Sequence, residues 1–214
     1  MTSPAMTSPA SSGPATTRPA DFHTRAVDAL HAAILASRAE SDPEDAVRHF
    51  TRATRALLGK PGAAEAPGAL KPGETQFIVS GCFFITPLRD SMILLADHGF
   101  PAAQRHARIS VTDSRPGHAV QTKTPAVVPN TDVDPIFRQI LSSGVVGCSV
   151  YVPVFWGDEV VGMFNTAAQA RYMYDETDLA VQVLFANAAI GAWIAKGGPD
   201  KLARLAAELG PFTG

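Results

Sequence analysis

The stretch Ser142-Ser-Gly-Val-Val-Gly-Cys-Ser-Val-Tyr-Val-Pro-Val-Phe-Trp-Gly-Asp-Glu-Val-Val-Gly-Met-Phe-Asn165 decides the fold. Its middle part, from Cys148 to Phe155, is rich in β-branched and aromatic residues, which favour strands. Gly157 follows in a short polar segment that we predict to be a tight turn, because glycine readily adopts a positive φ. Val160 to Asn165 is then the return strand. Since an isolated hairpin is only marginally stable in water, other strands and helices must complete the sheet.

Further strands and helices are predicted on both sides of this hairpin. Apolar runs bounded by turn residues predict strands within residues 76–86, 91–96, 108–111 and 125–129. A helix over 21–41 is predicted by apolar residues at helical spacing, namely Val27, Leu30, Ile34 and Leu35. Asp42 is the expected cap of a second helix, which starts at Pro43 and ends near Leu58.

Three more helices are expected after the first strands. Pro116 and Gly117 begin a short one over residues 115–122. The segment Asn130-Thr-Asp-Val-Asp134 is expected to cap a helix that begins at Pro135 and carries Ile136, Phe137, Ile140 and Leu141. Asp175 is the expected cap of a long apolar helix that ends at Gly197, and an amphipathic segment from Lys201 to Leu209 follows it.

Length and composition limit the classes of protein that the chain can represent. Its 214 residues favour one domain with appendages, and 46% hydrophobic residues are enough for a core. The formal charge of −2 argues against a nucleic-acid-binding surface, which needs a basic excess. We find neither a signal peptide nor an apolar run close to the roughly 20 residues that span a bilayer. The two cysteines do not suggest a disulfide framework, so a cytoplasmic protein without a membrane partner is expected.

The order of these elements predicts three segments and one fold class. Residues 1–20, rich in Pro, Ser, Thr and Ala, are expected to form a disordered tail. Residues 21–198 form the domain, and residues 199–214 form a C-terminal amphipathic tail. Helices at both ends of an antiparallel sheet indicate an α+β fold, with the terminal helices on one face of the sheet. The short inserted helices would cover the other face and enclose a pocket.

Five phrases in this order resemble a GAF domain over roughly residues 43–196. They are Gly117-His-Ala-Val120, Thr124-Pro-Ala-Val-Val-Pro-Asn-Thr-Asp-Val-Asp-Pro135, Ser149-Val-Tyr-Val-Pro-Val154, Gly157-Asp-Glu-Val-Val-Gly162 and Tyr174-Asp-Glu-Thr-Asp-Leu179. The resemblance implies an antiparallel sheet with a ligand pocket, but a fold does not specify a function.

Within that family, the chain is most similar to free-standing single-domain nitrate sensors, which signal through a sensor histidine kinase. The similar phrases are Ser80-Gly-Cys-Phe-Phe84, Phe137-Arg-Gln-Ile140 and Ala168-Gln-Ala-Arg171. The methionine-sulfoxide reductases of the family need reactive cysteines beside the inserted helices, whereas Cys82 and Cys148 fall on predicted strands. The bilin-binding members need a cysteine next to a histidine on the pocket helix, and this chain has none there.

The resemblance and the polar groups together predict a ligand site. A helix N-terminus offers unpaired amides and a partial positive charge, so the start of the helix at Pro116 is the favoured place for a small anion. The predicted ligand-binding residues are Phe84, Leu95, Ile109, Pro116, Gly117, His118, Phe137, Cys148, Ser149 and Tyr151. The apolar members of this set are more typical of an ordinary hydrophobic core, and a structural role is favoured for His118 over a ligand contact.

Two classes of function remain open at this stage. The first is a sensor that binds a small molecule or small anion, such as nitrate, and dimerises through its terminal helices, whose apolar residues include Leu30, Ile34, Val183, Ile190 and Trp193. The second is an enzyme built around residues such as Cys82, His98, His118 or Cys148, although no catalytic set or metal-ligand spacing is evident. A haem-binding sensor is a variant of the first class, with His98, His106 or His118 as axial ligand.

Overall fold

The computed structural model describes residues 17–140 and 144–213. In these residues the helices are α1 (Phe22–Ala39), α2 (Pro43–Leu57), α3 (Arg115–Thr122), α4 (Glu176–Ala195) and α5 (Gly198–Leu209). The strands are β1 (Ile78–Ile85), β2 (Ser91–His98), β3 (Arg108–Ser110), β4 (Ala126–Val128), β5 (Cys148–Trp156) and β6 (Glu159–Ala168). Short 3-10 turns are η1 (Ala63–Glu65), η2 (Ala102–Gln104) and η3 (Thr131–Val133). Of the tail predicted over residues 1–20, residues 1–16 lie outside the described residues. Residues 17–20 are described, and disorder there is corrected, because Arg18 binds Asp175.

The predicted hairpin is confirmed and lies at the centre of the sheet. The strand order is β3-β2-β1-β6-β5-β4, and all neighbours are antiparallel. Gly157 turns the chain with φ +60°, as expected for a two-residue loop. The return strand continues beyond the predicted Asn165 to Ala168, because β6 pairs with β5 on one side and with β1 on the other along this whole length. The fold is therefore α+β, as predicted.

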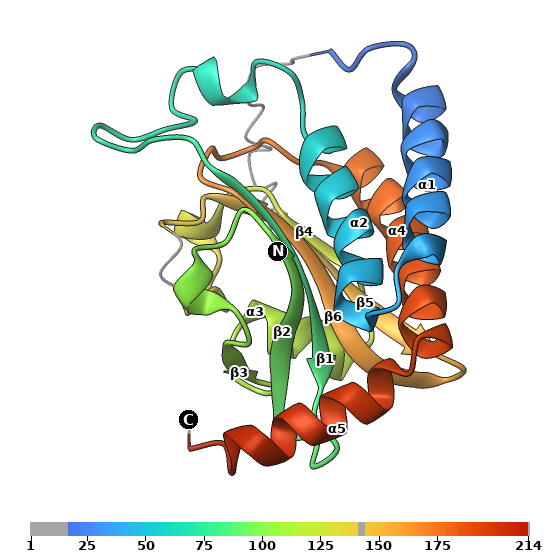
Figure 1. Cartoon of the computed structure of the whole chain (residues 1–214). Coiled ribbons are helices and arrows are strands. Elements are labelled where there is room, and N and C mark those ends of the chain that lie inside the picture. Colours follow the sequence, from blue (N-terminus) through green and yellow to red (C-terminus); the bar gives the residue numbers. More distant parts are fainter. Residues whose placement is uncertain (1–16, 141–143, 214) are drawn as a thin grey trace, which may run out of the picture.

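Helices α2 and α4 cover one face of the sheet, α1 packs on these two helices, and α5 crosses one end of the sheet (Figure 1). The Asp42 carboxylate accepts hydrogen bonds from the amides of Glu44 (2.8 Å) and Asp45 (3.3 Å), which confirms the predicted cap of α2. The Asp175 carboxylate accepts a hydrogen bond from the Asp178 amide, and the Asp178 carboxylate accepts one from the Asp175 amide. This capping box confirms the predicted cap of α4. The cap pair is also bound by Arg18, whose Nη2 lies 2.8 Å from Asp175 Oδ1.

Strand alternation separates the core into two layers. On the helix-covered face, β-strand side chains pack with α1, α2 and α4, and Phe84 stacks on Trp193 with ring centroids 4.1 Å apart. On the opposite face, a smaller cluster includes Phe83, Ile109 and Tyr151. Neighbouring residues of a strand point to opposite faces, so each strand contributes to both layers.

The apolar stripe of α1 points away from the core. The buried residues of this helix are small or lie at its start, namely Phe22, Ala26, Ala33 and Ser37. By contrast, Val27 is 64% exposed, Ile34 37% and Leu35 49%. Alanines allow α1 to pack closely against α2 and α4, which leaves the larger side chains outside.

The predicted helix from Pro135 is wrong for the described residues, which form no helix over 135–140. Asp134 does accept hydrogen bonds from the amides of Ile136 and Phe137, both at 2.8 Å. However, Arg138 donates to the carbonyls of Pro135 (3.1 Å) and Phe137 (2.8 Å). These contacts fix an irregular loop, because a side chain now occupies carbonyls that a helix would use. Leu141 lies outside the described residues.

Helix α4 corrects a second expectation. It is 20 residues long and apolar enough to cross a membrane by length and composition, although no such run was expected from the sequence. Its residues Phe185, Ala189 and Trp193 are buried in the core beneath the sheet. The apolar character of α4 therefore has a structural explanation within the domain.

The predicted C-terminal amphipathic segment forms α5, which begins at Gly198, slightly before the expected start at Lys201. Arg108 of β3 holds its end: Nη1 donates to the carbonyl of Gly210 at 2.6 Å, and the guanidinium lies 5.2 Å from the Phe212 ring centre. The segment therefore packs onto the domain.

Candidate functional site

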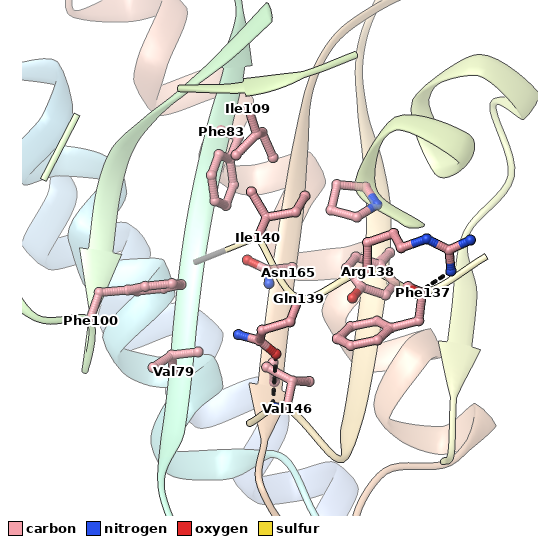
Figure 2. A pocket seen from close by; sticks show the side chains of 13 residues that line it. Val79, Phe83, Phe100, Ile109, Phe137, Arg138, Gln139, Ile140, Val146 and Asn165 are labelled. Atoms are coloured by element: carbon pink, nitrogen blue, oxygen red, sulfur yellow. Dashed lines mark hydrogen bonds between the residues drawn. The ribbon is translucent and has the colours of Figure 1, made fainter. Parts of the chain in front are cut away.

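A small cavity lies on the sheet face that the long helices leave free. Its floor comes from two rows of side chains that cross β1, β6 and β5. In one row Gly81 pairs with Asn165, which pairs with Tyr151. In the next row Val79 pairs with Ala167. Figure 2 shows Asn165 near the middle of this floor, between Phe83 and Val146.

Small residues at two positions shape the floor. Gly81 permits close packing: a Cβ atom there would lie 2.7 Å from Leu94 Cδ1, 3.1 Å from the Phe100 ring and 3.3 Å from Asn165 Oδ1, so these groups already fill the space above it. Ala167, in the neighbouring row, lines the cavity. A larger residue at position 167 would fill the space above the sheet.

Walls and mouth come from connecting segments. Phe100 follows β2, Ile109 lies on β3 and Pro116 lies on α3, whereas residues 137–140 form the loop before β5. The cavity volume is about 50 Å³. Because a water molecule needs about 10–15 Å³ on this measure, the cavity accommodates about four water-sized groups.

Two polar groups of the floor lie in an otherwise apolar site. Burial raises the pKa of Tyr151 to about 12, so its phenol keeps its proton at neutral pH and can donate a hydrogen bond. Asn165 is 8% exposed, and its Oδ1 has no hydrogen-bond partner among the described residues. Ser149 lies on the same face of β5, and its hydroxyl interacts with the Tyr151 phenol, which lowers the pKa of Tyr151 against the larger effect of burial. A buried polar atom such as Asn165 Oδ1 is normally satisfied by protein, water or ligand.

The mouth of the cavity, unlike its apolar walls, has polar and charged side chains. Gln139 Oε1 accepts a hydrogen bond from the Val146 amide at 3.1 Å, which ties the loop back to the approach to β5. Arg138 is exposed and is the one charged side chain among the described residues that line the cavity. The nearby Arg115 and Asp134 pair with each other, and the guanidinium, with other contacts, holds the pKa of Asp134 below its usual value against the opposing effect of burial.

Of the predicted ligand-binding residues, Ile109, Pro116, Phe137 and Tyr151 line the cavity. Phe84, Leu95 and Cys148 do not, and this is a correction: all three belong to the core on the helix-covered face. The physical reason is strand alternation, since Cys148 lies three positions from Tyr151 in a regular part of β5 and so points the opposite way. These three side chains therefore lie outside the cavity.

Only part of the predicted anion site at the start of α3 reaches the cavity. A Cβ at Gly117 would lie 2.8 Å from the backbone of Val111, so Gly117 permits close packing of α3 on the preceding loop. The His118 amide donates to the Ser114 carbonyl at 2.9 Å and is not available to a ligand. His118, Gly117 and Ser149 are not among the residues that line the cavity, whereas Pro116 is.

Sequence reasoning missed several lining residues. They are Val79, Phe83, Phe100, Arg138, Gln139, Ile140, Val146, Asn165 and Ala167. The two-residue hairpin loop at Gly157 does not reveal Asn165 and Ala167, because a bulge between Val154 and Phe155 shifts the register of the two strands by one residue. Residues 137–140 could not be deduced, since they were expected to be helical.

The cavity offers little support for thiol or haem chemistry. Cys82 and Cys148 are buried on the other face, and burial raises the pKa of both thiols, that of Cys148 to about 12. Among the described residues, no histidine lines the cavity and no group of His, Cys, Asp or Glu side chains is arranged to hold a metal ion.

Comparisons with known proteins agree with this architecture. A family model described as GAF domain matches residues 42–192. No curated protein matches the chain significantly. Among solved structures, the GAF domain of Acinetobacter phosphoenolpyruvate-protein phosphotransferase is 12% identical, with a TM-score of 0.64, over 80% of this chain and 94% of that one.

Two other solved structures are similar to the same extent. A putative GAF sensor protein from Burkholderia vietnamiensis is 16% identical, with a TM-score of 0.62, over 86% of this chain and 99% of that one. The free methionine-R-sulfoxide reductase from Neisseria meningitidis, solved with its substrate, is 18% identical, with a TM-score of 0.61, over 86% of this chain and 96% of that one. At these identities the likeness concerns the fold alone.

Proposed function

The chain belongs to the GAF domain family, and from this premise we propose that it is a cytoplasmic sensor that binds a small molecule or small anion in the cavity above β1, β5 and β6. The observation that carries the proposal is an apolar enclosure whose floor holds the unpaired Asn165 Oδ1 and the phenol of Tyr151. Binding sites commonly combine an apolar lining with a few convergent polar groups. The GAF family generally comprises ligand-binding regulatory domains, and the reductases among them show that the fold also supports enzymes.

In this proposal, ligand binding changes the conformation of the residues at the mouth of the cavity. Residues 137–140 line the site and are tied to the approach to β5 by the bond between Gln139 and Val146. A ligand that contacts both the floor and this loop would favour one loop conformation, and a ligand shifts an equilibrium by as much as its affinities for two states differ. A partner protein such as a sensor histidine kinase would then bind the loop and its surroundings in one of the two conformations.

Nitrate is the anion that the family resemblance suggests. It has four non-hydrogen atoms, a size that suits the cavity of about 50 Å³. Arg138 at the mouth and the phenol of Tyr151 are its candidate donors, because a guanidinium suits planar oxyanions. The reductase alternative has less support, since neither cysteine reaches the cavity.

A thermal-shift screen tests the sensor proposal. Nitrate, nitrite, formate, acetate, amino acids, nucleotides and compact amides would be added separately to the full chain. A compound at about 100 times its dissociation constant should stabilise the protein by about 2.7 kcal/mol, or about 5–10 °C in a chain of this size. Ala167→Leu should remove this shift by filling the cavity, whereas Ala203→Leu on the exposed side of α5 should retain it. If no compound stabilises the wild type more than Ala167→Leu, the proposed site is wrong.

We also propose that the sensor is a homodimer that associates through α1 and α4. Ile190 and Trp193, expected to contribute, are buried in the core, but Val27, Ile34, Leu35 and Leu184 are exposed. Beside them runs a shallow groove of small residues that includes Ala188, Gly191 and Ala192. An apolar ridge beside such a groove suits contact with a second copy.

Light scattering tests this association. The wild type should show twice the chain mass of 22.5 kDa at micromolar concentration, and Leu35→Glu should shift it toward the monomer, because it places a charge in the contact. Leu88→Glu is the matched control, since Leu88 is 80% exposed in the turn between β1 and β2, outside the proposed contact, and should leave the mass unchanged. A wild-type mass of 22.5 kDa at that concentration would refute the dimer.

A further inference from the structure

The side-chain oxygen of Asn165 on the cavity floor restricts which chemical groups a ligand can place there. Asn165 Oδ1 is buried, lacks a hydrogen-bond partner among the described residues, and would lie 3.3 Å from a Cβ at Gly81. Asn165 itself lines the cavity and lies near the middle of its floor (Figure 2). A buried acceptor without a partner is costly, so its occupant should carry an N–H or O–H group.

Charge in the cavity leads to the same class of ligand. Arg138, the one charged lining residue that the structure describes, donates Nη1 to the carbonyls of Pro135 and Phe137 at 3.1 and 2.8 Å. Its guanidinium is thus turned toward its own exposed loop, as Figure 2 shows for the bond to Phe137. An anion on the floor would be buried without a compensating cation, which is strongly unfavourable.

Tyr151 supplies the complementary group. It pairs with Asn165 across β5 and β6 and lines the same cavity, so the floor carries a hydroxyl donor and an amide acceptor on neighbouring strands. An uncharged ligand with both an N–H and a carbonyl would satisfy both. An anion such as nitrate has acceptors only and would leave Asn165 Oδ1 unpaired.

We infer that the natural ligand is a compact uncharged molecule of the amide or urea class, whose N–H donates to Asn165 Oδ1 and whose carbonyl accepts from the Tyr151 hydroxyl. This inference rests on the proposed sensor function and narrows its ligand. The ligand should have about four non-hydrogen atoms in the enclosed part, given about 10–15 Å³ for each water-sized group. Such small molecules bind weakly, with dissociation constants no tighter than about 0.1 mM.

Urea and nitrate form a matched pair of probes, because each is planar with four non-hydrogen atoms, but only urea is uncharged and has N–H donors. Each would be titrated to 50 mM into the isotope-labelled full chain, with amide chemical shifts as the readout. We expect urea to shift the resonances of Gly81, Asn165 and Ala167 in a saturable manner, and nitrate at equal ionic strength to shift them at least tenfold less. Acetamide should behave as urea does.

Two variants make the test specific. Asn165→Leu should weaken urea binding at least tenfold without lowering the melting temperature, because it removes a buried acceptor that has no partner. Tyr151→Phe should weaken binding while the Asn165 side-chain resonances remain in place. Saturable binding of nitrate without binding of urea would overturn the inference and leave the sensor proposal standing. Binding of neither probe would overturn the inference alone, since the wider screen with Ala167→Leu decides the sensor proposal separately.

Discussion

Replacing Trp193 with alanine is expected to lower the free energy of unfolding by about 3–5 kcal/mol. Trp193 is 2% exposed and joins three elements: it lies on α4, its ring stacks on Phe84 of β1, and it lies against the start of α5. A Cβ at Gly198 would come within 2.1 Å of this ring, so the contact with α5 is close. Removing the ring leaves a cavity that both the sheet and α5 border, and close packing on three sides limits its collapse.

Chemical denaturation followed by circular dichroism measures this loss. Trp156→Ala is the matched control, because Trp156 is the other tryptophan of the chain and is 52% exposed at the hairpin turn. It should change the free energy of unfolding by no more than about 0.5 kcal/mol. Equal losses in the two variants would contradict the assignment of Trp193 to the centre of the core.

The sequence was sufficient for the order and type of most elements because their signals are local. The hairpin was recognisable from β-branched residues and a glycine turn, and the caps at Asp42 and Asp175 lie where side-chain acceptors precede apolar helices. The helix expected from Pro135 failed for a physical reason. Arg138 binds two carbonyls of that segment, an interaction that a pattern of apolar spacing does not reveal.

The candidate site was harder to predict than the fold, because it depends on which face of the sheet each residue occupies. Phe83 and Phe84 are adjacent and equally apolar, yet Phe83 lines the cavity and Phe84 stacks on Trp193. Choosing between them requires the register with β6, which the amino-acid pattern of β1 does not supply: apart from Ile78 at its start, this strand is buried along its whole length. That Asn165 lines the cavity could not be predicted for the same reason, because its partner Gly81 lies on a strand distant in sequence.

A second large effect is expected at Arg171, which binds two carboxylates at the edge of the cavity-bearing face. Arg171 is 2% exposed; its Nη2 donates to Glu74 Oε1 at 3.0 Å and its Nε donates to Asp132 Oδ2 at 2.9 Å. Its amide also donates to the Ala69 carbonyl at 2.9 Å. One side chain therefore fixes the long loop before β1 and the η3 turn to the end of β6.

Arg171→Met should lower the free energy of unfolding by about 3 kcal/mol at pH 7, because it leaves the partly buried Glu74 without its cation and Asp132 with Lys71 alone. Arg89→Met is the matched control: Arg89 is 55% exposed and lies 3.7 Å from an exposed Glu159, so its loss should be at most about 1 kcal/mol. Urea denaturation at pH 7 measures both. A loss in Arg171→Met no larger than in the control would contradict the role given to the buried guanidinium.

The pH dependence separates the charge of Arg171 from its packing. The Arg171 guanidinium holds the pKa of Glu74 and of Asp132 below their ordinary values of 4.5 and 3.8. The folded protein therefore binds fewer protons than the unfolded chain in this range, so the stabilisation is complete above about pH 5 and declines as the pH falls through the folded pKa values. Other carboxylates with lowered pKa also destabilise the wild type in acid, so the difference between the two proteins is the useful quantity. Between pH 7 and pH 3 the stability difference between wild type and Arg171→Met should shrink. A difference that stays constant over that range would mean that Arg171 acts through packing alone.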